Sequence, residues 1–199
     1  MDKSIVEKIY NDTFAGCTMF YRDTTLDEKL ISKYKQNQIL QERGFTDMSF
    51  KGGGLKQNLR YLIASSKGKN LSAMNPQSEQ FGHILLKSNS FFKILDIYKL
   101  EDKTQILLLN ISEESIELFR SSTSNIEKQV IEKGRESLNL KLNTPAIAEH
   151  ETTEWRERTK HPIGMSDKGE FFYQQMINKQ DNEIAEVKEK RKKPWWKKW

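Results

Sequence analysis

Residues 81–111 read FGHILLKSNSFFKILDIYKLEDKTQILLLNI, and this is the most apolar stretch of the 199-residue chain. Two runs within it, 91–100 and 103–111, are rich in β-branched and aromatic residues and flank a short polar break at Glu101-Asp102. This pattern is typical of an antiparallel hairpin. We therefore expect the centre of a β-sheet here.

The turn at the polar break sets the register of the predicted hairpin, which pairs Ile97 with Ile106 and Leu95 with Leu108. Both faces of the hairpin are then apolar at the centre, whereas a sheet with one face in water would alternate apolar and polar residues. We expect this hairpin to be covered on both sides, by helices, by a curled sheet or by a partner subunit in a homo-oligomer.

Periodicity elsewhere predicts further helices and strands around this hairpin. A capping box at Ser124–Glu127 predicts the start of one of the helices. The sequence predicts an α+β fold with an antiparallel sheet centred on hairpin 91–111, covered by helices, with a projecting C-terminal helix and a disordered basic tail. The expected helices are 2–14, 26–43, 126–138 and 149–159, and the expected strands are 59–64, 117–120 and 138–142. The expected organisation is a single domain over 1–172, a projecting polar helix over 173–187 and a flexible tail over 188–199.

Composition bounds the class of protein. The chain is 31% charged, yet its ten Phe, six Tyr and four Trp are too many for a disordered protein. No apolar run approaches the roughly 18 residues that span a bilayer, and the N-terminus lacks the basic start and apolar centre of a signal peptide. The single cysteine, Cys17, suits a reducing compartment. These features predict a cytoplasmic protein.

The basic charge is concentrated at the C-terminus. Residues 188–199, KEKRKKPWWKKW, hold seven of the 33 Lys and Arg and one of the 28 Asp and Glu. The tail therefore carries a net charge of +6, and the rest of the chain is nearly neutral at −1. A nucleic-acid-binding face would need cations clustered on the folded body, and the sequence indicates none there.

Three tryptophans among these cations suit three kinds of partner. Trp and Lys together favour the headgroup region of an anionic membrane, Trp can anchor in a groove of a protein partner, and both can hold single-stranded nucleic acid. A weakly selected disordered end is the plain alternative. The predicted partner-binding residues are Lys190, Arg191, Lys192, Lys193, Trp195, Trp196, Lys197, Lys198 and Trp199.

The chain has one glycine cluster, Gly52-Gly53-Gly54, with Lys56 close by. Backbone N–H groups of such a loop can approach a phosphate. The spacing matches neither the Walker A pattern nor the dinucleotide fingerprint, and the residues that follow, LRYLIAS, read as a strand where both motifs need a helix. A flexible loop or hairpin turn is the favoured interpretation.

Three side chains are candidates for catalysis, Asp96, His83 and Cys17. Asp96 lies on an apolar face of the predicted hairpin and, if buried, needs a cationic partner or a raised pKa. A carboxylate paired with a cation is the favoured interpretation. His83 is expected to be a hydrogen-bonded core or sheet-edge residue, and Cys17 a small buried hydrophobe.

The stretch HETTE resembles a zinc-protease motif, but Glu154 stands where the second histidine would be. His150 and Glu154 could share a metal with His161. The surrounding acids pair readily with arginines on an exposed helix, so neither a metal nor a cofactor is expected.

The main functional prediction is a non-enzymatic cytoplasmic binding or adaptor protein whose Lys/Trp tail contacts a protein partner or an anionic membrane surface. The alternative is a small enzyme with a pocket near the Gly52–Gly54 loop or around Asp96 and His83. A third possibility, single-stranded nucleic-acid binding, depends on the tail alone.

Overall fold

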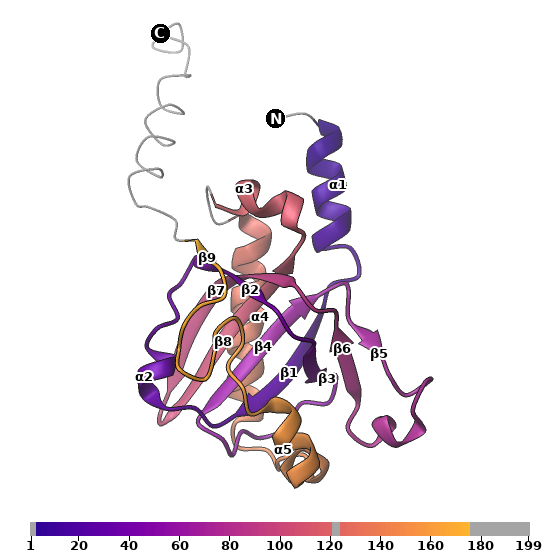
Figure 1. The fold of residues 1–199 in the computed structure, drawn as a ribbon, viewed down its shortest axis with the longest axis vertical. Coiled ribbons are helices and arrows are strands. Elements are labelled where there is room, and N and C mark those ends of the chain that lie inside the picture. Colours follow the sequence, from indigo (N-terminus) through magenta and orange to yellow (C-terminus); the bar gives the residue numbers. More distant parts are fainter. Residues whose placement is uncertain (1–2, 121–123, 176–199) are drawn as a thin grey trace, which may run out of the picture.

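The computed structural model describes residues 3–120 and 124–175. These residues form a nine-stranded sheet in the order β5-β6-β3-β1-β4-β8-β7-β2-β9, with helices packed around it (Figure 1). The α+β prediction is confirmed. The sheet is mixed rather than antiparallel, because β4 and β8 run parallel at its centre.

The strands are β1 Thr18–Thr24, β2 Ile39–Glu42, β3 Thr46–Ser49, β4 Leu59–Ser65, β5 Lys69–Asn70, β6 His83–Leu86, β7 Ser90–Leu100, β8 Lys103–Ile111 and β9 Gln174–Gln175. The helices are α1 Lys3–Thr13, α2 Glu28–Ile31, α3 Ile116–Phe119, α4 Asn125–Lys141 and α5 Thr153–Thr159, with short 3-10 turns at Pro76–Glu79, Glu113–Ser115 and Ala148–Glu151.

The predicted hairpin is present as β7 and β8, and its turn uses Glu101 with a positive φ of 55°. Ile97 pairs with Ile106 as predicted. The predicted pairing of Leu95 with Leu108 is wrong, because a bulge between Ile94 and Asp96 makes Ile94 the partner of Leu108. A bulge adds one residue to one strand, so the residues of β7 before the bulge are shifted by one relative to the register set at the turn.

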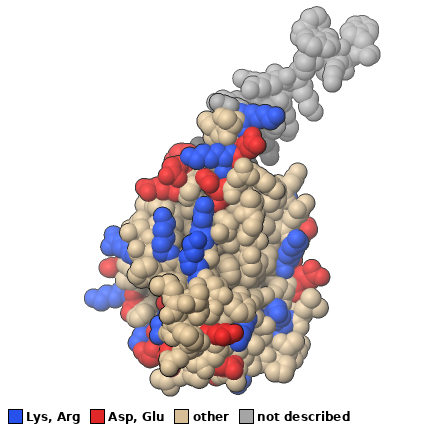
Figure 2. Space-filling view, turned by 90° about the vertical axis from the view of Figure 1, so that its right-hand side faces the viewer, with Lys and Arg blue, Asp and Glu red and all other residues tan. Residues whose placement is uncertain are grey.

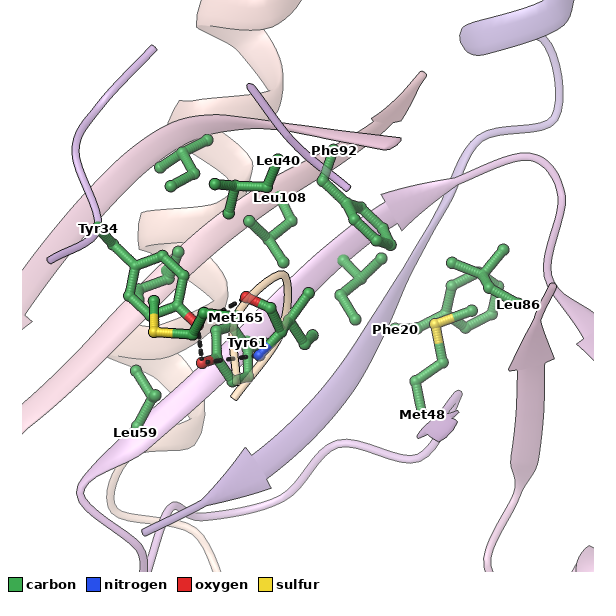
Figure 3. Packing of buried hydrophobic residues seen from close by; sticks show 14 of the residues in the cluster. Phe20, Tyr34, Leu40, Met48, Leu59, Tyr61, Leu86, Phe92, Leu108 and Met165 are labelled. Atoms are coloured by element: carbon green, nitrogen blue, oxygen red, sulfur yellow. Dashed lines mark hydrogen bonds between the residues drawn. The ribbon is translucent and has the colours of Figure 1, made fainter. Parts of the chain in front are cut away.

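Both faces of the sheet are covered, as the hairpin predicted. One face carries a buried cluster that includes Phe92 and Leu108, and it continues to Met165 near the C-terminus (Figure 3). The other face buries a second cluster, including Leu107 and Leu109, whose partly buried neighbours include Val130 of α4. Figure 1 shows α4 behind the sheet and the C-terminal segment in front of it.

Helix α4 begins at the predicted capping box, in which Ser124 and Glu127 each accept from the other's backbone N–H. The Glu127 side chain also accepts from Lys93 Nζ of β7 at 2.7 Å, and both side chains are essentially fully buried. This ion pair joins the first turn of α4 to the sheet. Breaking such a pair leaves an uncompensated buried charge.

Three predicted elements before residue 160 differ from the structure. The helix expected over 26–43 is limited to α2, and its second half forms β2 against β7. The strand expected over 117–120 is helix α3, and the strand expected over 138–142 is the last turn of α4. Leu138 is fully buried and Leu140 is 70% exposed, an alternation that a helix end and a strand share.

Residues 160–175 form a segment that crosses one face of the sheet and ends as β9 on the edge of β2; we call it the strap (Figure 1). Gln174 and Gln175 form β9, where the sequence predicted the first turn of a polar helix over 173–187. The rest of that helix and the tail over 188–199 lie outside the described residues. Among residues 3–120 and 124–175, no helix is both long and apolar enough to cross a membrane.

Candidate functional site

A pocket of about 450 Å³ opens where β1 and β3 meet the strap. Its walls come from three separated parts of the chain: β1, the β2–β3 connection, and the segment from the end of α5 through the strap. The lining residues are Arg22, Glu42, Gly44, Phe45, Thr46, Asp47, Arg158, His161, Pro162, Ile163, Met165, Ser166, Asp167 and Phe172. The volume falls in the range of small-molecule sites.

Arg22 of β1 provides the buried cation of this pocket. The residue is 5% exposed, and its Nη1 and Nη2 donate to the carbonyl oxygens of Asp47 at 3.1 Å and His161 at 2.9 Å. Its Nε has no hydrogen-bond partner among the described residues, and none of the ion pairs found there includes Arg22. Burial lowers the pKa of the guanidinium, an effect opposed by the nearby Tyr61 and Asp47. The surroundings therefore disfavour its positive charge.

Thr46 of β3 provides a second unpaired polar atom in the same pocket. It is fully buried, and its Oγ1 has no hydrogen-bond partner in the described part of the chain. Buried polar groups are nearly always hydrogen-bonded, so each exception calls for an explanation. Arg22 Nε and Thr46 Oγ1 are two such exceptions, and both residues line the same pocket.

The outer part of the pocket carries cationic and aromatic side chains. Arg158 forms an exposed pair with Glu154, and the His161 ring pairs with Asp167. Phe45 is 63% exposed at the pocket wall. An exposed aromatic ring beside cations suits a ligand that has a planar ring and an anionic group.

The buried His83 pairs with the partly buried Asp47 next to this pocket. His83 Nε2 lies 2.7 Å from Asp47 Oδ1, across the antiparallel β3–β6 pairing in which Ser49 lies opposite His83. The Trp155 ring of α5 meets the His83 ring edge-on at 5.2 Å between centroids. Asp47 also lines the pocket, so this pair places a carboxylate that is hydrogen-bonded to an imidazole at the pocket wall.

The other two catalytic candidates lie elsewhere. Asp96 accepts two hydrogen bonds from Arg135 of α4, at 2.7 and 2.8 Å, and this pairing raises the pKa of Arg135. Asp96 is thus a buried carboxylate paired with a cation, which is the favoured interpretation. Cys17 lines a different groove beside Tyr10, and burial raises the pKa of its thiol. The structure does not bring Asp96, His83 and Cys17 together.

The Gly52–Gly54 loop packs against the end of α4. The carbonyl of Gly52 accepts from Lys141 Nζ, the carbonyl of Gly53 accepts from Arg60 Nη2, and the N–H of Gly54 donates to the Pro145 carbonyl. A Cβ on Gly52 would lie 2.5 Å from the Tyr21 ring. The loop thus turns carbonyl groups, rather than a row of N–H groups, toward cations. The predicted phosphate-binding residues Gly52, Gly53, Gly54 and Lys56 stay a prediction.

The three metal candidates are also separated. His150 is buried, and its Nε2 hydrogen-bonds with the Phe81 carbonyl at 3.0 Å. Glu154 pairs with Arg158, and His161 pairs with Asp167. No group of three potential metal ligands is found among residues 3–120 and 124–175.

The predicted partner-binding residues from Lys190 to Trp199 lie outside the described residues, so binding of a membrane or a protein by the tail stays a prediction. On the folded body, Figure 2 shows basic and acidic side chains separated by broad areas of other residues on the side of β5 and β6. That face carries no continuous basic surface.

Sequence reasoning missed Arg22, Thr46 and Arg158. One signal was present: Phe20, Arg22 and Thr24 alternate along β1, and all three are buried. An arginine between two inward positions of a strand indicates a buried charge that needs an acceptor. From the sequence alone, residues 17–22 fit a short strand as well as an extension of the first helix, and this alternation has meaning only for a strand.

No family model matches the chain, and no curated protein matches it in sequence. Solved structures that resemble it include the Vis toxin, an ADP-ribosyltransferase from Vibrio splendidus, at 17% identity and a TM-score of 0.39, covering 49% of this chain and 50% of that one. The ADP-ribosyltransferase HopU1 of Pseudomonas syringae matches at 20% identity and a TM-score of 0.43, covering 48% and 46%. Exoenzyme S from Pseudomonas aeruginosa matches at 13% identity and a TM-score of 0.41, covering 53% and 55%.

The chain thus spans about half the length of the structures that it matches. At TM-scores below 0.5 the likeness assigns no family, and the site is argued from its own residues. Vis and HopU1 are named for an enzymatic activity. The prediction of a non-enzymatic, protein-binding adaptor is thereby corrected. The cytoplasmic location stays a prediction.

Proposed function

We propose that this chain is a small enzyme that binds a phosphate-bearing, nucleotide-like ligand in the Arg22 pocket and catalyses its hydrolysis or the transfer of a group from it. The buried Arg22 guanidinium carries the proposal, because it lines a pocket, forms no ion pair in the described part of the chain and has an unpartnered Nε.

The unpartnered Nε of Arg22 favours a hydrogen-bond acceptor at this position. Moving a charge out of water is costly unless an opposite charge and hydrogen bonds compensate it. Arg22 has two backbone carbonyls as acceptors but no carboxylate among its hydrogen-bond partners in the described residues. The nearby Asp47 and Glu42 carboxylates favour the charged form of the guanidinium without being among its hydrogen-bond partners. A phosphate oxygen would accept from the unpartnered Nε, and the planar guanidinium suits phosphate because it can bind two oxygens at once.

The remaining lining fits the other parts of such a ligand. The unpaired hydroxyl of Thr46 can donate to a second phosphate oxygen. Arg158 adds a second cation at the pocket wall, and the exposed ring of Phe45 offers a surface for a planar base. The volume of about 450 Å³ accommodates a ligand of this size.

The His83–Asp47 pair supplies acid–base chemistry. A carboxylate held by an imidazole at 2.7 Å can accept a proton from water or from a hydroxyl as that group attacks the ligand. Arg22 would stabilise the negative charge that develops on the leaving phosphate. In this assignment Arg22 anchors the ligand, and Asp47, oriented by His83, is the general base.

Binding measurements test the proposal directly. Isothermal titration of the full chain with inorganic pyrophosphate, ADP and NAD should detect binding of at least one; NAD is included because the exoenzyme S structure is bound to carba-NAD. Arg22→Gln should weaken that binding at least about tenfold, the loss expected for one charge-assisted hydrogen bond. Arg156→Gln is the matched control, because Arg156 lies two residues from Arg158 but lines a different pocket.

Two results would contradict the proposal. One is the absence of binding by all three probes. The other is a binding constant that is the same in the Arg22→Gln variant as in the wild type, which would place the ligand elsewhere.

A further inference from the structure

We propose that the strap, residues 160–175, is an autoinhibitory element that competes with the anionic ligand for Arg22. This inference rests on the function proposed above and concerns the regulation of the same pocket. In the structure the strap is closed, and its backbone takes a position on the guanidinium that a phosphate would use.

The strap and the anion would compete for one nitrogen of Arg22, Nη2. Arg22 Nη2 donates to the His161 carbonyl at 2.9 Å, while the neighbouring Nε has no partner in the described chain. A bidentate oxyanion commonly contacts two neighbouring guanidinium nitrogens. A phosphate bound to Nε and Nη2 would therefore approach the nitrogen that holds the strap. Full engagement of the anion favours withdrawal of the His161 carbonyl.

Buried hydrogen bonds hold the strap closed just beyond His161. Tyr34 Oη donates to the Ile163 carbonyl at 2.7 Å, Tyr34 and Tyr61 share a 2.7 Å hydrogen bond, and the Ile163 N–H donates to Tyr61 Oη at 3.4 Å (Figure 3). The Gly164 N–H donates to Glu42 Oε2 at 2.7 Å. These contacts fix the backbone just after Pro162, and the Arg22 contact to His161 fixes it just before, so displacement of His161 is transmitted to the amides of Ile163 and Gly164.

A second anchor lies outside the pocket. Lys33 Nζ donates to the Gly169 carbonyl at 2.8 Å. Gly164 and Gly169 both have positive φ values, 81° and 77°, and bound a tight turn in which the Ser166 N–H donates to the Glu170 carbonyl and the Gly169 N–H donates to the Ser166 carbonyl. Lys33 does not line the pocket, so removing its side chain loosens the strap without touching the ligand site.

Competition and cooperation make opposite predictions. If the strap competes with the ligand, any change that loosens the strap strengthens ligand binding, and the ligand in turn loosens the strap by the same factor. If the strap is instead a required wall of the pocket, loosening it weakens binding and the ligand protects it. The sign of the coupling decides between the two.

The experiment combines hydrogen exchange with titration, using the full chain and inorganic pyrophosphate as the probe. Competition predicts that saturating pyrophosphate speeds exchange of the Ile163 and Gly164 amides, which are bonded to Tyr61 and Glu42 rather than to ligand. Lys33→Ala should bind pyrophosphate about fivefold more tightly than the wild type, at the lower end of common coupling strengths. Lys29→Ala, on helix α2 four residues before Lys33, is the matched control and should leave the affinity unchanged, because the Lys29 side chain has no contact with the strap among those found in the described residues.

The outcomes separate this inference from the function on which it rests. Suppose that pyrophosphate binds and that binding depends on Arg22. Slowed or unchanged exchange of the strap amides, or weaker binding by Lys33→Ala, would then overturn the autoinhibitory role while the proposed anion site would still hold. Absence of pyrophosphate binding in both the wild type and Lys33→Ala, or binding that does not depend on Arg22, would overturn both.

Discussion

Arg22 Nη2 of β1 donates to the carbonyl oxygen of His161, a residue 139 positions later in the chain, at 2.9 Å. This contact joins the buried cation of the pocket to the segment that covers it. The two hydrogen-bond acceptors of this guanidinium are both backbone carbonyls, not carboxylates. The same residue thus holds the strap and remains available to an anion.

Replacing Arg22 by lysine tests whether the shape of the guanidinium matters as well as its charge. Lysine keeps the positive charge but cannot bind two oxygens in a planar arrangement. We expect Arg22→Lys to bind pyrophosphate about tenfold more weakly than the wild type, a loss of about 1.4 kcal/mol. Titration calorimetry measures this loss. Equal affinity would show that a point charge suffices and that bidentate contact is absent.

The buried Lys93–Glu127 pair should matter greatly for stability. Lys93→Met leaves the Glu127 carboxylate buried without the 2.7 Å partner on β7. Breaking a buried pair in this way costs about 3–5 kcal/mol of unfolding free energy, which urea denaturation measures. The double variant Lys93→Met with Glu127→Gln should recover a large part of that loss, because Gln carries no charge and can still accept from the Ser124 N–H. A loss below about 1 kcal/mol in the single variant would contradict the assigned role of the pair.

The sequence predicts the centre of the sheet better than its margins. The hairpin of β7 and β8 follows from two apolar runs and a polar break, which are local features. The bulge after Ile94 depends on how the strand curves against its neighbours, and no local signal marks it. The sequence does not predict strand β2, because Ile39 and Leu40 fit the apolar side of a helix as well as they fit a strand. Pairing with β7 makes this segment a strand.

The site was harder to predict than the fold for a physical reason. His83 was identified as a candidate, but its partner Asp47 lies 36 residues away and becomes visible only through the pairing of β3 with β6. Arg22 meets its acceptors Asp47 and His161 through contacts between distant segments. A single sequence shows which residues carry charge. It does not show which of those charges are buried without a partner.

The Gly52–Gly54 loop should prove to be closely packed rather than flexible. A Cβ on Gly54 would lie 2.0 Å from the backbone oxygen of Thr144, whereas a Cβ on Gly44 would meet only the Glu42 carboxylate at 3.3 Å. Backbone cannot move aside as a side chain does, so we expect Gly54→Ala to lower the unfolding free energy by about 1–3 kcal/mol. Gly44→Ala serves as the control and should change it by less than about 0.5 kcal/mol. Thermal and urea denaturation measure both. Similar values for the two variants would show that the loop is free to rearrange.

Stability should depend on pH through His150. Burial lowers the pKa of His150, and the hydrogen bond to the Phe81 carbonyl only partly offsets this. Its ring stacks on Trp155 at 5.0 Å between centroids. Because the folded-state pKa is below the unfolded value of about 6.5, the unfolded chain binds more protons as the pH falls. The unfolding free energy therefore decreases from pH 7.5 to pH 5.5, and the contribution of His150 is fully present only above about pH 6.5. The lowered pKa values of Glu151 and Glu157 affect the unfolding free energy only at lower pH, below the ordinary value of 4.5.

In His150→Gln the decrease in unfolding free energy between pH 7.5 and pH 5.5 should be smaller than in the wild type, as measured by urea denaturation at several pH values. An identical slope in both proteins would show that protonation of His150 is not coupled to unfolding.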